Sequence, residues 1–172
     1  MKRLVQATIL LAILATLSGC SEHRAQVAVQ SALTAGAEAL SSADRVVAHG
    51  IPEAGDAARA AVAAECPAPC ADWSPRYREA MSPWYDATRG LEVAAEALRL
   101  AQEGLDIWVD TGALPGGWSA LCVDVGESLA ALLELLGACG VDVPELLHRA
   151  PPVAETACRL ASQYAQSAEV TP

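Results

Sequence analysis

Cysteine thiols are the side chains of this chain with the widest choice of chemistry. They can form disulfides, bind soft metals or carry a covalent lipid. The 172-residue sequence holds an even set, which in an exported protein would suit three disulfides. Spacing and surroundings decide which chemistry each of them favours. The six are Cys20, Cys66, Cys70, Cys122, Cys139 and Cys158.

The segment Cys66-Pro-Ala-Pro-Cys70 has the closest cysteine spacing. Zinc sites usually bring a second cysteine or histidine pair at a matching spacing, and none is visible here. Redox motifs of the thioredoxin type have two intervening residues rather than three. A structural disulfide is therefore the favoured interpretation, and we expect no metal or other cofactor. The alternative is a metal- or small-ligand-binding bundle that uses Cys66, Cys70 and Cys122.

The first cysteine follows a stretch typical of an export signal. Lys2 and Arg3 precede an uncharged apolar run over residues 4–17. A transmembrane helix takes roughly 20 apolar residues, so this run is short for a span but suits the core of a signal peptide. We expect residues 1–19 to be a signal peptide that is removed before Cys20.

The residues at the expected cleavage point carry a resemblance to a known class. Leu17-Ser18-Gly19-Cys20 resembles the lipobox of bacterial lipoproteins, and the resemblance covers the first twenty residues only. It implies a diacylglyceryl group on the Cys20 sulfur, so that palmitate would label the protein, and an anchored domain outside the cytoplasm. Ser21 resembles a sorting residue for the outer membrane, facing the periplasm, if the host has two membranes. The acyl chains alone would hold the protein at the membrane.

The lipid on Cys20 would leave an odd set of five cysteines. We expect two disulfides among them and one unpaired thiol. Cys122 and Cys139 lie about 25 Å apart on one predicted helix and cannot bond to each other. A bond between Cys139 and Cys158 is the favoured one. Cys66 and Cys70 could close a small loop, or either could reach Cys122.

The charge of the mature chain limits its partners. Removing residues 1–19 takes two cations from a chain of net charge −10 and leaves about −12. Phosphate neutralisation needs a basic face, so nucleic acid is not an expected partner. Lys2 is the one lysine of the sequence, so the mature chain has no amine for Schiff-base chemistry.

No arrangement of residues in the sequence predicts an enzyme. There is no Gly-x-Ser-x-Gly elbow, His-Glu-x-x-His pair or phosphate-binding loop. His23, His49 and His148 are scattered and suit capping or solvated roles. The acids between Glu92 and Asp110 suit a solvated helix face better than an ion site. We therefore expect no catalytic residues.

An aromatic cluster is the strongest surface candidate. It combines tryptophan, tyrosine and arginine, which are enriched at binding hot spots. A lid that supplies bulk over one end of an alanine-rich bundle is the favoured interpretation, and a protein interface is the alternative. The cluster comprises Trp73, Arg76, Tyr77, Trp84 and Tyr85.

Apolar residues recur at helical spacing and no segment alternates with period two, which predicts an all-α fold. The first helix should end near Gly50-Ile51-Pro52, with a second over residues 53–65 and a break at 66–70. Ser74 and Pro75 should start the next helix, and Pro83 could kink or restart it. Its apolar seam comprises Leu91, Ala94, Leu98, Ala101, Leu105 and Trp108.

The C-terminal part should hold a helix over residues 118–138 and a short one over 144–149. Pro151-Pro152 should end that short helix, and the last helix should follow. The expected architecture is an antiparallel bundle of four main helices with one or two short extra helices. Residues 20–24 would form a lipid-anchored tether and residues 25–169 a single domain.

Together these features predict a lipid-anchored, extracytoplasmic helical bundle with a structural or protein-interaction role in the cell envelope, and a prophage gene is one hypothesis for its origin. Its partners would be the membrane, through the lipid anchor, and an envelope protein.

Overall fold

The computed structural model describes residues 21–66, 72–143 and 145–169 of the chain. This part of the chain folds into four helices and holds no strand, which confirms the predicted all-α bundle. The expected signal peptide, Cys20 and Cys70 lie outside the described residues. The helices are α2 (Ser21–Glu65), α3 (Trp73–Thr111), α4 (Trp118–Ala138) and α5 (Glu145–Glu169).

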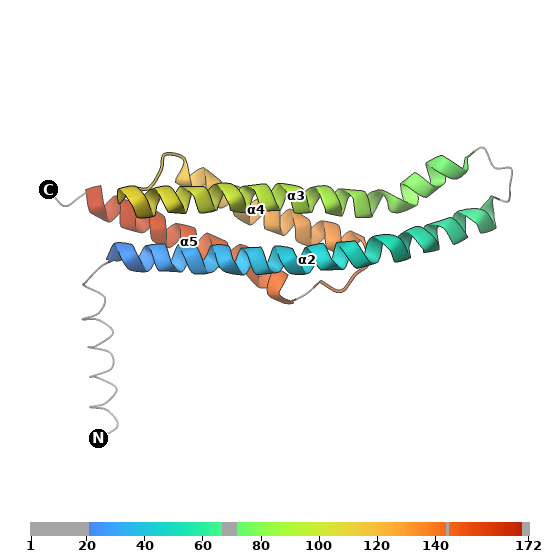
Figure 1. The fold of residues 1–172 in the computed structure, drawn as a ribbon, viewed down its shortest axis with the longest axis horizontal. Coiled ribbons are helices and arrows are strands. Elements are labelled where there is room, and N and C mark those ends of the chain that lie inside the picture. The colour runs from blue at the N-terminus through green and yellow to red at the C-terminus, as the bar shows by residue number, and fades with distance from the viewer. Residues whose placement is uncertain (1–20, 67–71, 144, 170–172) are drawn as a thin grey trace, which may run out of the picture.

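The four helices pack in a ring in chain order. α2 lies against α3 and α5, and α4 lies against the same two, so α2 and α4 are diagonally opposed. In Figure 1 consecutive helices run in opposite directions. The contacts agree with this view, because Gly36 lies beside Leu98 and the later Gly50 lies beside the earlier Trp84.

The core combines small residues on two helices with large ones on a third. Ala43 of α2 and Ala94 of α3 are fully buried, so these helices approach closely. α4 contributes Leu129, Leu132 and Leu136, each at most 1% exposed. Burying a leucine side chain contributes about 1.5–3 kcal/mol, so α4 provides much of the apolar stabilisation of an alanine-rich bundle.

The predicted end of the first helix is wrong. α2 continues through Gly50 and Pro52 as one helix of 45 residues. At Pro83, where a kink or a restart was expected, α3 continues as one helix. A proline inside a helix removes one backbone hydrogen bond and kinks the helix, but the turns on both sides keep their own bonds. Packing on the neighbouring helix then keeps the two halves in one continuous helix.

The predicted short helix over residues 144–149 and the predicted last helix are one element, α5, so no short extra helix occurs among the described residues. Pro151-Pro152 does not end it. The buried residues continue at helical spacing across the prolines, and this continuous seam against the bundle keeps the register. The seam comprises Leu147, Ala150, Ala154, Ala157 and Ala161.

The N-terminal ends of α2 and α3 also differ from prediction. α3 starts at Trp73 with Asp72 as its N-cap residue, before the predicted Ser74. α2 starts at Ser21, so the predicted tether is helical from its second residue on. The Tyr164 hydroxyl of α5 donates a hydrogen bond of 3.1 Å to the Glu22 carboxylate, which fixes this first turn to the bundle.

One pair of helices extends beyond the other two (Figure 1). We call residues 52–65 of α2 and 73–83 of α3 the arm, and the remaining described helical residues the body. α4 ends at Ala138, so the arm is a two-helix hairpin without a third or fourth helix beside it.

Candidate interaction site

The disulfide of the body differs from the favoured prediction. Cys122 of α4 bonds to Cys158 of α5, with Cα atoms 5.7 Å apart. The predicted Cys139–Cys158 bond is wrong, because Cys139 lies at the opposite end of α4 and carries a free thiol. Cys158 lies thirteen residues into α5, about 20 Å along the helix from its start near Cys139.

The remaining cysteines bear on the metal-binding alternative. Cys66, at the end of α2, is disulfide-bonded. Cys66 and Cys122 are therefore both oxidised, and a disulfide sulfur is not the thiolate that a metal requires. Among the described residues, no three histidine, cysteine or acidic side chains lie close enough together to hold a metal ion.

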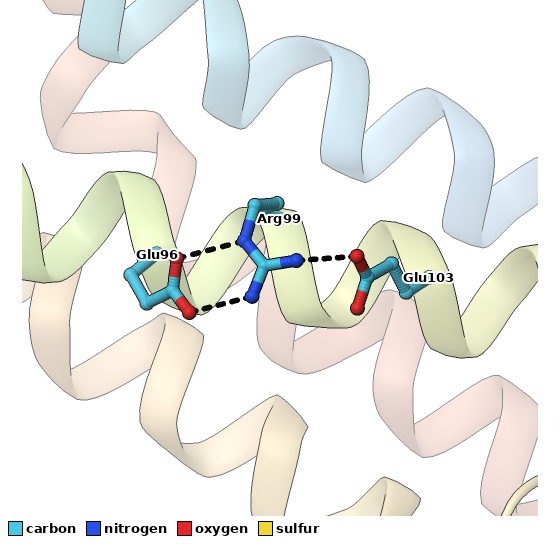
Figure 2. Close-up of polar contacts among 3 residues, drawn as sticks. All are labelled: Glu96, Arg99 and Glu103. Atoms are coloured by element: carbon cyan, nitrogen blue, oxygen red, sulfur yellow. Dashed lines mark hydrogen bonds and ion pairs between the residues drawn. The ribbon is translucent and has the colours of Figure 1, made fainter.

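The acidic residues of α3 between Glu92 and Asp110 lie on a solvated face of the helix. Two of them form ion pairs with Arg99 on the same face (Figure 2). Arg99 donates hydrogen bonds to both oxygens of Glu96, at 2.8 and 2.6 Å, and another to Glu103. The bond from Arg99 lowers the pKa of Glu96. All three side chains are about half exposed, so this triplet stabilises the helix surface and forms no enclosed site.

The aromatic cluster divides into a buried and an exposed part. Trp84 is 7% exposed and belongs to the core at the base of the arm, so it is not a surface residue. Tyr85, its neighbour in sequence, points outward and is 51% exposed. Trp73 and Tyr77 stack on the arm with ring centroids 5.3 Å apart, and both are partly exposed.

The stacked pair lies where the two helices of the arm are joined by polar contacts. Arg76 of α3 forms an ion pair of 2.9 Å with Glu65 of α2. A Cβ at Gly55 would lie 3.1 Å from the Tyr77 hydroxyl, so this side chain reaches across to α2. Arg59 has a raised pKa, chiefly from its hydrogen bond with Asp56 and also from Tyr77. These contacts fix the aromatic pair on the arm without enclosing it.

Between the aromatic pair and the body lies a small core that is separate from the core of the body. Its buried members are Ala58, Met81 and Trp84. Cys139 and Val141, from the loop between α4 and α5, pack against it where arm and body meet. The predicted lid over one end of the bundle thus holds for Trp84 alone, whereas Trp73, Tyr77 and Tyr85 lie at the surface.

Two surface grooves escaped the sequence analysis. One, of about 310 Å³, lies between α4 and α5 over the disulfide. The other, of about 420 Å³, lies between α2 and α5 and is lined mainly by apolar and small residues such as Ala28, Val153 and Leu160. Val153 and Leu160 are spaced by seven residues, which predicts a buried face, yet both are more than 40% exposed. Both grooves are open and lack a buried charged side chain.

None of the described helices is both long enough and apolar enough to span a membrane. Comparison of the chain with models of protein families, with curated proteins and with solved structures finds no match.

Proposed function

We propose that this chain is a lipid-anchored, extracytoplasmic protein that acts in the cell envelope through protein contacts made by its arm. The observation that supports this function best is the partly exposed Trp73–Tyr77 pair on a hairpin with no other helix beside it. Tryptophan, tyrosine and arginine dominate protein-binding hot spots, and the arm presents all three. The absence of a nucleophile and base pair in the sequence favours a non-catalytic role.

The geometry of α2 supports the same proposal. The helix starts one residue after Cys20 and runs for 45 residues, or about 67 Å, to the end of the arm. A lipid on Cys20 would therefore lie near one end of the molecule and the aromatic pair near the other. Such a molecule would hold its contact surface well away from the membrane that anchors it.

Metabolic labelling tests the anchor. Radioactive palmitate should label the wild-type protein in cells and should not label Cys20→Ser. Cys139→Ser is the matched control, because it removes a free thiol of the folded domain and should be labelled like the wild type. Label that persists in Cys20→Ser, or is absent from the wild type, would overturn the lipid anchor.

Site-specific crosslinking tests the arm. A photoreactive amino acid at Ser74, exposed beside Trp73, should give an adduct with an envelope protein, whereas the same group at Glu38 on the body should not. Trp73→Ala with Tyr77→Ala should abolish the adduct at Ser74. The role of the arm is refuted if Ser74 gives no adduct, if both positions give the same adduct, or if the double substitution leaves the adduct unchanged.

A further inference from the structure

Both helices of the arm carry a proline at the same level. Pro52 is the proline inside α2, and Pro83 is the one inside α3. Their levels match because Gly50 and Trp84, one or two residues away, are in contact across the pair. Each proline lacks the N–H that would bond to the carbonyl four residues earlier, at Ala48 and Glu79. The hairpin is therefore weakened in both helices at one cross-section.

This cross-section is also where the four-helix packing ends. α4 stops at Ala138, and the loop residues Cys139 and Val141 are its last contacts with the arm core. Figure 1 shows both α2 and α3 changing direction here. Bending at this level would disturb only the small core at the base of the arm, since the core of the body lies almost wholly on one side of it.

One side chain fixes the direction of the arm at this level. Trp84 is buried against Gly50 so closely that a Cβ there would lie 1.9 Å from its Cη2 atom. No residue larger than glycine fits without displacing the indole. Trp84 also packs with Met81 and Ala58, so the same ring joins the arm core to the body.

We propose that Pro52 and Pro83 form a hinge and that Trp84, seated on Gly50, is the latch that sets the direction of the arm. The hinge lets the arm change direction as a unit while the body stays folded. This inference deepens the proposed function, and its biological meaning rests on that function, because the arm is the proposed contact surface. Its tests need no partner and no lipid.

The free thiol of Cys139 is a native reporter of the latch. It packs against the arm core and is only partly exposed. Burial, and to a smaller extent Asp86, raise the pKa of this thiol, so it reacts slowly near neutral pH while the latch is closed. Opening of the latch would uncover it and speed its reaction with iodoacetamide.

Alkylation of the mature protein, with its disulfides intact, tests the latch. Gly50→Ala should raise the rate at Cys139 roughly tenfold, because the added methyl group overfills the contact with Trp84. Gly36→Ala is the matched control on the same helix pair. Its Cβ would meet only the flexible end of Leu98, and the rate should stay as in the wild type. Equal rates in all three proteins would refute the latch.

A second test removes the two prolines and should slow the reactions that Gly50→Ala speeds up. Pro52→Ala with Pro83→Ala restores two N–H donors, so Cys139 alkylation and amide exchange around residues 48–52 and 79–83 should both slow several-fold. Pro152→Ala, inside α5 and away from the arm, should change neither. Unchanged rates in the double variant would refute the hinge even if Gly50→Ala proved unstable. If the alkylation and exchange rates are as expected but the photoreactive group at Ser74 gives no adduct in the otherwise wild-type protein, the proposed function is refuted and the hinge is not.

Discussion

The body and the arm are built from the same two long helices, yet they are stabilised in different ways. In the body, α2 and α3 are covered by α4 and α5, and one continuous core runs through all four helices. In the arm, the same helices have only each other, and a separate small core at its base comprises Ala58, Met81 and the neighbouring Trp84. A two-helix hairpin cannot enclose a core on all sides, so its side chains stay partly exposed.

Because of this difference, the body stabilises the fold, whereas the arm carries the exposed aromatic side chains. The body holds the large buried leucines and the Cys122–Cys158 bond, which stabilise the whole fold. The arm holds the stacked aromatic pair and the paired prolines, which suit contact and movement. Regions with few buried contacts open at a lower free energy than the core of a domain. We therefore expect substitutions in the two regions to have global and local effects, respectively.

The largest effect should come from the core of the body. Leu132→Ala removes a fully buried side chain of α4 and should lower the free energy of unfolding by about 2–5 kcal/mol. Chemical denaturation followed by circular dichroism measures this loss. Leu100→Ala is the control, because Leu100 is 36% exposed on α3 and should lose much less. Similar losses in the two variants would contradict the assignment of the main core to the body.

The disulfide should have the next largest effect, also on the whole fold. Cys122 and Cys158 are 36 residues apart, and removal of a crosslink over such a loop costs about 3–4 kcal/mol. Cys122→Ala with Cys158→Ala should lower the denaturation midpoint accordingly. Cys139→Ala should cost less, because it removes a free and only partly buried thiol. A greater loss from Cys139→Ala would show that the disulfide pairing is wrong.

A substitution in the arm should act locally. Met81→Ala empties part of the arm core, where the side chain is 1% exposed, and should cost about 2 kcal/mol of local stability. Amide exchange should quicken in residues 52–65 and 73–83 and stay unchanged in α4 and α5. Faster exchange in α4 as well would mean that arm and body unfold as one unit.

The smallest effect should come from the exposed ion pairs of α3. Arg99→Ala should lower the melting temperature slightly at neutral pH, and added salt should reduce the difference from the wild type. Arg99 lowers the pKa of Glu96 below its ordinary value of 4.5, so the stabilisation is present above that pH and is lost as the pH falls. The two melting temperatures should therefore converge in acid. A difference that grows in acid would contradict this charge assignment.

The sequence by itself determined the helical class and the buried face of α3, but not that of α5, where Val153 and Leu160 are exposed although their spacing is typical of a buried face. The seam of α3 predicted from spacing is buried at Ala94, Leu98, Ala101, Leu105 and Trp108, as the structure shows. Helical periodicity reports on each helix alone, so local spacing was enough for this result. The types of residue, rather than their spacing, marked the aromatic cluster as the strongest surface candidate, with a lid as the favoured interpretation and a protein interface as the alternative.

Tertiary structure decided the helix ends, the burial of single side chains and the disulfide pairing, because these depend on contacts between helices. Proline lowers the local helical propensity, but packing on a long partner carried α2 through Pro52 and α5 through its proline pair. Trp84 is buried and Tyr85 exposed because successive residues of a helix point in different directions, and the packing of α3 on α2 turns Trp84 toward Gly50. Cys158 bonds to Cys122 because helix lengths set which residues face each other across a bundle, and no local pattern in the sequence encodes that alignment.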